Sequence, residues 1–280
     1  MGLMQKHTLK QEISLSGIGI HSGKNATLKL KPSDYGEIIF IRTDLENLKF
    51  LLDPAKVVTH NSSIMTSGDK KIQTVEHLLA ALYMSGIDSL TIELDGGEVP
   101  IMDGSSLPFV KAIRAAGIKS VDKERRAIKI EKPFMVEDGK GSIFVKPYID
   151  LKISYSIYYD HPLIGTQKYS IKAEEKIFAQ EIAPARTFGF LKDVPALKAK
   201  NMAQGGSLEN ALVLDSQGLI NGPLRFPDEF IRHKILDLIG DIAFLGSPIF
   251  AHFSAKRAGH KLHLKAIRFI QKHKDYWTFL

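Results

Sequence analysis

Histidine and aspartate recur at one-turn spacing within residues 232–241. His233, Asp237 and Asp241 follow one another at intervals of four residues, among side chains that are mostly Ile and Leu. Residues four apart share one face of an α-helix, and the apolar neighbours indicate that much of this helix is buried. An unpaired buried charge is costly, so this polar stripe is either paired or bound to a metal. Two interpretations stay open here: a metal site, and a His–Asp hydrogen bond on an exposed face.

A second pair of candidate catalytic residues stands near the start of an earlier apolar segment. Residues 74–85 are apolar around most of a helical circumference and include the adjacent Glu76 and His77. Neighbouring helical residues point about 100° apart, so the imidazole can reach a metal while the carboxylate acts on water as a general base. The alternative is a solvated first helical turn. The pair is not the His-Glu-x-x-His motif of zinc peptidases, because the second His is absent.

His77, His233 and Asp237 together make a three-ligand set of the kind that binds catalytic zinc with one position left open. The chain has no cysteine, so His, Asp or Glu must hold any metal. His260, which follows Gly259, is a further candidate for a pocket residue, with a surface histidine beside a helix start as the alternative. Sequence spacing alone does not tell whether the two helices meet.

The elements that must position these residues fall into two similar series. Polar–apolar alternation predicts strands, and apolar periodicity followed by glycine predicts helices. Each half runs through strands first and helices later, which indicates two α+β domains split near residue 125. Predicted strands span 11–16, 26–31, 38–42, 57–60, 89–94, 128–131, 142–145, 151–159 and 211–214. Predicted helices span 74–85, 106–116, 228–245 and 260–272; 173–182 stays open between helix and strand, 187–211 is irregular, and 255–259 is a turn.

Composition indicates a soluble globular protein with a basic surface. Hydrophobic residues make up 44% and charged residues 25% of the 280 residues, and the net charge is +7. A nucleic acid, an anionic membrane, an anionic substrate or an ordinary solvated surface each account for that charge, but nothing resembles an RNA-binding motif. Residues 1–7 lack the apolar core of a signal peptide, and no apolar stretch of about 18 residues occurs. We expect a cytoplasmic protein that binds no nucleic acid.

Six short segments, taken in order, resemble the UDP-3-O-acyl-N-acetylglucosamine deacetylases, the zinc-dependent family of lipid A biosynthesis. The matching segments span nearly the whole chain, and six motifs in collinear order are hard to obtain by chance. They are GIGIHSG at 17–23, TVEHL at 74–78, MDGSS at 102–106, RTFG at 186–189, RHKILD at 232–237 and Gly259-His260.

The resemblance implies an α+β fold of two similar domains, 1–125 and 126–280. Each domain would carry a small sheet and two helices, with the helices sandwiched between the two sheets. Both metal-bearing helices would then lie at the domain interface, which explains polar residues on apolar helices. Residues 187–211 correspond to an insert that forms an apolar passage for an acyl chain, with Leu191, Val194 and Met202 as lining residues.

The resemblance also implies the metal site and its general base. His77, His233 and Asp237 would bind one Zn²⁺ per chain, in a ligand set that also tolerates Fe²⁺. Glu76 would be the general base that activates water.

The resemblance also implies roles in the reaction for further residues. His260 would be a cationic general acid or an electrostatic stabiliser, and Asp241 would orient it. Thr187 would help to hold the oxyanion of the tetrahedral intermediate. Phe188 and Lys234 would contact the substrate, the lysine near its anionic nucleotide sugar.

The implied reaction is hydrolysis of the N-acetyl group of UDP-3-O-acyl-N-acetylglucosamine, with release of acetate. This substrate carries a diphosphate and a fatty acyl chain, and its synthesis near an anionic inner membrane would favour a basic surface with peripheral membrane contact. We expect a monomer. Two alternatives are a zinc amidohydrolase of another acylated amine and a non-catalytic basic nucleic-acid-binding protein. A catalytically dead scaffold is disfavoured because every candidate catalytic residue is present.

One segment departs from the pattern of the family. Residues 61–64, Asn-Ser-Ser-Ile, hold no cysteine, although some members place one near the metal. That cysteine is not a required ligand, so its absence leaves the implied mechanism unchanged.

Overall fold

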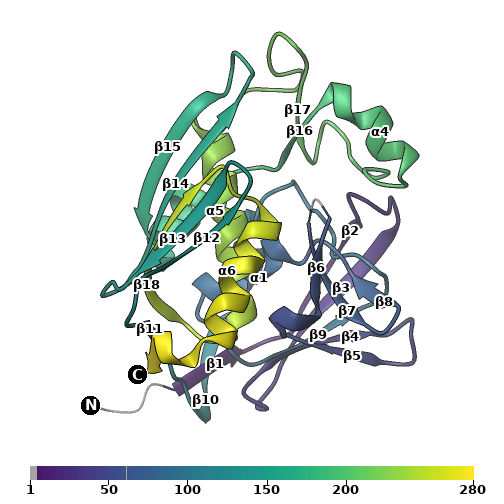
Figure 1. Cartoon of the computed structure of the whole chain (residues 1–280). Helices are drawn as coiled ribbons and strands as arrows, with labels where there is room; N and C mark the ends of the chain where they lie inside the picture. The colour runs from purple at the N-terminus through teal and green to yellow at the C-terminus, as the bar shows by residue number, and fades with distance from the viewer. Residues whose placement is uncertain (1–4, 61) are drawn as a thin grey trace.

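The protein has an α+β fold (Figure 1), described here by a computed structural model that covers residues 5–60 and 62–280. Residues 1–4 of the N-terminal segment and Asn61 of the cysteine-free segment lie outside the described residues. The α-helices of the described residues are α1 (Glu76–Met84), α2 (Leu107–Ala116), α3 (Glu175–Ile177), α4 (Val194–Ala199), α5 (Glu229–Ile242) and α6 (His260–Lys272). None of these helices has the length and apolar character that a membrane span needs.

In the described part of the first half of the chain, strands pair only with one another. A five-stranded sheet has the order β2-β3-β9-β4-β5, a three-stranded sheet has the order β6-β7-β8, and β1 pairs with β10. The strand that follows α1, β9, lies at the centre of the larger sheet. The strands are β1 (Gln5–Leu9), β2 (Ile13–Ile18), β3 (Asn25–Pro32), β4 (Ile38–Arg42), β5 (Leu48–Leu51), β6 (Val57–Thr59), β7 (Ser63–Ser67), β8 (Lys70–Ile72), β9 (Leu90–Leu94) and β10 (Ile118–Glu124).

Strands of the second half form a separate seven-stranded sheet and a small parallel pair, β16-β17. The path of the sheet is β12-β13-β18-β11-β19, and β14 joins it through β18 and carries β15 at its edge. No described pairing joins a strand within 5–124 to one within 128–279. The strands are β11 (Ile128–Ile130), β12 (Phe134–Asp138), β13 (Gly141–Lys146), β14 (Leu151–Tyr159), β15 (Gly165–Lys172), β16 (Phe188–Phe190), β17 (Leu212–Leu214), β18 (Ile249–Lys256) and β19 (Trp277–Phe279).

The four long predicted helices and the nine predicted strands are confirmed, with ends that shift by a few residues. The predicted turn at 255–259 is wrong at its start, since Ala255 and Lys256 end the missed strand β18. This strand pairs with β13, β14 and β11 and is central to its sheet. Its inward residues include Ala251 and Ala255, so its apolar alternation is weak in the sequence.

The other strands that the sequence analysis did not predict are either short or, like β18, show little apolar alternation. In β15, Ile171 is the one buried position, because this strand lies at the sheet edge. The open segment 173–182 is helical, with α3 followed by a π-helical turn over Phe178–Ile182. The irregular segment 187–211 contains β16, a 3₁₀ turn over Leu191–Asp193 and α4.

Two helices at the centre of the molecule are buried nearly all round. Figure 1 shows α1, α5 and α6 between the two large sheets. Eight of nine residues of α1 and twelve of fourteen residues of α5 are buried. A helix that is hydrophobic on all sides needs such a position, and the polar residues on these two helices are therefore buried with them.

A glycine lets α1 and α5 approach each other closely. A Cβ atom added at Gly240 of α5 would stand 2.1 Å from the carbonyl oxygen of Glu76 and 2.9 Å from its Cα. No real Cβ contact is that short, so only glycine fits here. The glycine within a helix, otherwise unfavourable by about 1 kcal/mol relative to alanine, is thus explained by packing against the backbone of a candidate catalytic residue.

We predict that Gly240→Ala destabilises the protein although alanine is the better helix former. Forcing the added methyl against the α1 backbone is expected to lower the free energy of unfolding by about 1–3 kcal/mol, as overpacking does. Denaturant unfolding measures this change. Gly218→Ala is the matched control, because a Cβ there meets nothing within 4 Å. Equal stability of Gly240→Ala and wild type would contradict the close approach.

Candidate active site

The buried carboxylate of Glu98 forms hydrogen bonds both with the glycine-rich turn at 17–23 and with the segment just before α1. Thr74, just before α1, has a positive φ of 58°, and its hydroxyl donates to Oε1 of Glu98 over 2.8 Å. Glu98 also accepts from the backbone N–H groups of His21 (2.9 Å) and Ser22 (2.7 Å). These bonds hold two of the predicted motifs together. Sequence analysis missed Glu98, although an acidic residue just before the apolar Val99-Pro100-Ile101 run was a usable signal.

The predicted ligand residues of α1 and α5 meet in space. One donor atom from each of His77, His233 and Asp237 lies within 4.8 Å of the others. Asp237 Oδ1 is 3.7 Å from His77 Nε2 and 3.3 Å from His233 Nε2. All three side chains are buried. The packing of the two helices therefore brings together residues that are 160 positions apart in the sequence (77 to 237).

The hydrogen bonds of His233 favour a metal-binding tautomer. Its Nδ1 lies 3.0 Å from the carbonyl oxygen of Ala185, which accepts a hydrogen bond, so the hydrogen is on Nδ1 and the lone pair is on Nε2. Burial lowers the pKa of His233 to about 4, so the imidazole is neutral near neutral pH. His77 Nδ1 is buried and has no hydrogen-bond partner among the described residues.

Asp237 supplies the negative charge of the group. Burial alone would raise the pKa of this carboxyl, but Lys234 and His233 outweigh burial and hold the pKa well below its ordinary value. Lys234 Nζ donates to Asp237 Oδ2. Two imidazoles and an ionised carboxylate fit the nitrogen and oxygen ligands that zinc takes in catalytic sites.

Glu76 and His260 flank the donor group. Glu76 Oε1 lies 3.8 Å from His260 Nε2, and Glu76 Oε2 accepts from the backbone N–H of Ser63 over 3.1 Å. Burial raises the pKa of Glu76 above its ordinary value. His260 Nε2 is also 3.9 Å from Asp237 Oδ2, so this imidazole faces the same space as the donor group.

Asp241 forms a hydrogen bond with Nδ1 of His260. Its Oδ2 lies 2.7 Å from His260 Nδ1, and the Ser63 hydroxyl donates to its Oδ1. Burial alone would lower the pKa of His260, but Asp241 outweighs burial and raises that pKa to about 9. The pKa of Asp241 falls to about 2 because His260 outweighs its burial. Sequence analysis missed Ser63 and His263, whose Nδ1 also lies 2.7 Å from Asp241 Oδ2.

Thr187 is held by two backbone hydrogen bonds, one of them to the 102–106 motif. Its N–H donates to the carbonyl of Gly104 over 2.8 Å, and its own carbonyl accepts from Leu212 N–H over 2.8 Å. Gly104 has a positive φ of 84°, and a Cβ there would stand 2.2 Å from the carbonyl oxygen of Asn210. The 102–106 and 186–189 motifs thus contact each other through their backbones.

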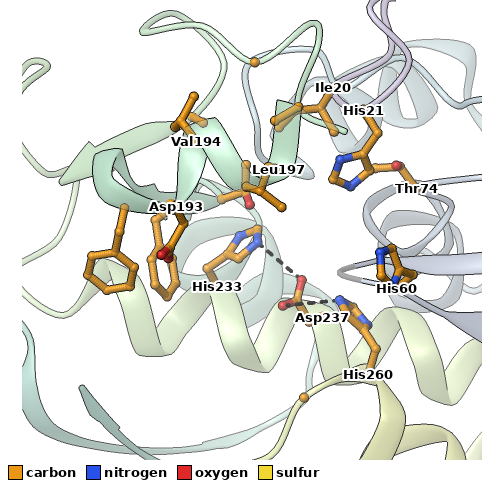
Figure 2. A pocket seen from close by; sticks show the side chains of 18 of the residues that line it. Ile20, His21, His60, Thr74, Asp193, Val194, Leu197, His233, Asp237 and His260 are labelled. Carbon is orange, nitrogen blue, oxygen red and sulfur yellow. Dashed lines mark ion pairs between the residues drawn. The ribbon is translucent and has the colours of Figure 1, made fainter. Parts of the chain in front are cut away.

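A cavity of about 1070 Å³ opens onto these residues. Figure 2 shows His233, Asp237 and His260 on one side of it, with His21 and His60 across from them and α4 beside them. Its lining includes Glu76, His77, His233, Asp237, His260, Thr187, Phe188, Lys234, Leu191 and Val194. Met202, the third residue predicted to line an acyl-chain passage, is 5% exposed and is not among the residues that line this cavity, which include the adjacent Ala203.

A three-donor group of this kind, with a carboxylate and an imidazole beside an open cavity, is typical of metal-dependent hydrolases. Comparison with known proteins specifies the family. The model of the UDP-3-O-acyl N-acetylglycosamine deacetylase family matches residues 6–272, and the chain belongs to this family.

Relatives match over almost their full length. A UDP-3-O-acyl-N-acetylglucosamine deacetylase of Thermodesulfovibrio yellowstonii is 48% identical over 268 residues, which cover 93% of this chain and 90% of the relative. The deacetylase of Leptospira biflexa is 43% identical over a match that covers 96% of this chain and 90% of the relative. The deacetylase of Myxococcus xanthus is 44% identical over a match that covers 94% of this chain and 85% of the relative.

Proposed function

We propose that this protein hydrolyses the N-acetyl group of UDP-3-O-acyl-N-acetylglucosamine, releasing acetate in lipid A biosynthesis. The observation that carries the proposal is the convergence of His77, His233 and Asp237 within 4.8 Å, beside Glu76 and His260. Relatives with this activity in their names match nearly the whole chain. A nucleic-acid-binding protein has no need of this buried group, and an amidohydrolase of another amine is disfavoured by those relatives.

The architecture proposed for this activity has two domains, 1–125 and 126–280. The absence of described strand pairing across Arg125 and Arg126 supports this division. The position of α1 and α5 between the large sheets supports a sandwich in which both metal-bearing helices lie at the domain interface.

In this proposal one zinc ion is held by His77, His233 and Asp237, in a donor set that Fe²⁺ also suits. Bound zinc supplies Lewis-acid chemistry, polarising the amide carbonyl and making water more acidic. Glu76 takes the proton from the attacking water. Its buried position and its bond from Ser63 N–H hold the carboxylate at one orientation.

His260 then acts on the departing amine or on the charge that develops beside it. The Asp241 carboxylate holds the proton on Nδ1 of His260, so that Nε2 faces the cavity. Because the pKa of His260 is raised to about 9, the imidazole is a cation at neutral pH. The hydroxyl of Thr187, which also lines the cavity, donates to the oxyanion of the tetrahedral intermediate.

The acyl chain and the nucleotide sugar of the substrate would contact different residues of the cavity. Leu191 and Val194 flank a passage for the acyl chain, and Phe188 packs edge-on against Phe230 with ring centroids 5.0 Å apart. Lys234 lines the cavity and is held by Asp237, which places its cation near an anionic nucleotide sugar.

The protein is further proposed to be a cytoplasmic monomer that contacts an anionic inner membrane peripherally. The outward face of the second large sheet supports this contact. Lys146, Lys152 and Lys256 point outward from adjacent strands, and Phe144 and Tyr158 on the same face are 38% and 47% exposed. Lysine clusters beside exposed aromatic residues suit an anionic lipid surface.

Binding to vesicles rich in anionic phospholipid tests this contact. We expect co-flotation of wild type at physiological salt and its loss in the triple variant K146E/K152E/K256E, because each lysine near such a surface contributes about 1 kcal/mol. Lys10→Glu, Lys49→Glu and Lys119→Glu together give a control of equal charge change on the other half. No flotation of wild type, or equal loss in the control, rejects this surface.

Metal content and deacetylase activity, measured on the same preparations, test the site. We expect one metal per chain in wild type and in Glu76→Ala, and much less in Asp237→Ala, with activity largely lost in both variants. The reason is that Glu76 stands beside the donor group while Asp237 is part of it. If wild type binds no metal and both variants are as active as wild type, the proposed function is rejected.

A further inference from the structure

A second histidine, His263, shares the carboxylate oxygen that supports His260. Both Nδ1 atoms lie 2.7 Å from Asp241 Oδ2. His263 follows His260 by one helical turn of α6, so both imidazoles reach Asp241 from the same face of that helix. The side chains of His263 and Asp241 are fully buried. The proposed mechanism uses His260 and Asp241 and gives His263 no role.

The partners of His263 define where its protons lie. An ionised Asp241 is an acceptor, so His263 Nδ1 must carry a hydrogen and donate it. Burial lowers the pKa of His263, which leaves Nε2 without a hydrogen near neutral pH. The hydroxyl of Tyr155 lies 2.9 Å from that Nε2 and 2.9 Å from the carbonyl of Ala258, and its single proton can go to either acceptor.

Asp241 is therefore held by three donors from two other elements. The Ser63 hydroxyl of β7 bonds Oδ1, and two imidazoles of α6 bond Oδ2, while the carboxylate itself is on α5. A carboxylate is loosely restrained about its terminal torsion, so the direction of Oδ2 depends on these donors. With His263 absent, His260 would be the one remaining donor to Oδ2 among the described side chains.

We propose that His263 is a positioning residue for deacetylation: its Nδ1–H fixes Asp241, and Asp241 thereby orients His260 toward the reacting amide. His263 lies outside the cavity lining and acts through Asp241 alone. This inference rests on the proposed function, since it assigns the orientation of His260 a part in that reaction.

Three variants separate the donor at Nδ1 from the rest of the side chain. His263→Asn keeps a donor at the position of Nδ1 and loses the ring. His263→Leu keeps apolar volume and loses the donor. Tyr155→Phe removes the partner of Nε2 and leaves the bond to Asp241 in place. The measurements are kcat and KM for deacetylation, the melting temperature, and zinc per chain.

We expect His263→Leu to lower kcat by about ten- to a hundredfold, the worth of one hydrogen bond to a charged group, with KM changed less than about twofold. His263→Asn and Tyr155→Phe should keep kcat within about threefold of wild type. All three should retain zinc, because none of these positions belongs to the donor group. Wild-type kcat in folded His263→Leu, or an Asn variant as slow as the Leu variant, overturns the proposal.

A spectroscopic measurement on the wild type avoids any dependence on folding of the variants. Nitrogen-15 NMR of isotope-labelled wild type should show His263 as a neutral imidazole protonated on Nδ1, with its ring signals assigned by through-bond correlation to its own backbone. Protonation on Nε2 alone would overturn the proposal, since Nδ1 could not donate to Asp241. If wild type has no deacetylase activity, the proposed function fails, while the NMR result still reports on the bond itself.

Discussion

The close contact of α1 with α5 is the constraint on which the candidate active site depends. Gly240 lies against the backbone of Glu76, where any Cβ would collide with the carbonyl oxygen. This approach places His77 of α1 opposite Asp237 of α5, with Nε2 and Oδ1 3.7 Å apart. Moving either helix outward by the width of a methyl group would separate the donor atoms. The two helices lie between the two large sheets, and most of their side chains are buried.

Burial of so many charged groups at one interface requires that they compensate one another. Lys234 and Asp237 pair directly, and His260 stands between Glu76 and Asp241. An isolated buried ion would be strongly destabilising, whereas a paired and hydrogen-bonded group is tolerated. The pKa of Glu76 rises through burial, while the pKa of Asp241 falls to about 2 through its imidazole partners. The pKa values of two carboxylates within one site are thus shifted in opposite directions, as the general base proposed for Glu76 and the permanent anion proposed for Asp241 require.

Residue types and spacing were enough to predict the long helices and to single out His77, His233 and Asp237 as candidate ligands, because helical periodicity links His233 to Asp237 directly, but they left the metal site open. The meeting of α1 with α5 was not predictable from that periodicity, and the resemblance to a family supplied it. Strand β18 was missed because alanines occupy two of its inward positions. Ser63, Glu98 and His263 were missed because each acts through contacts with residues at least 13 positions away, such as Ser63 with Glu76, and single polar residues carry no periodic signal. Which residues of the irregular segment 187–211 line the cavity does not follow from its composition: Leu191 and Val194 do, and Met202 is not among them.

The most direct test of this account locates the metal itself. Crystals of zinc-loaded wild-type protein, measured at the zinc absorption edge, should give one anomalous peak about 2.0–2.2 Å from a donor atom of each of His77, His233 and Asp237. Glu76 should lie near that peak without being a ligand. A peak centred instead on Asp241, His260 and His263, the other cluster of potential ligands, would contradict the account, as would full deacetylase activity in crystals and solution with no peak at either place.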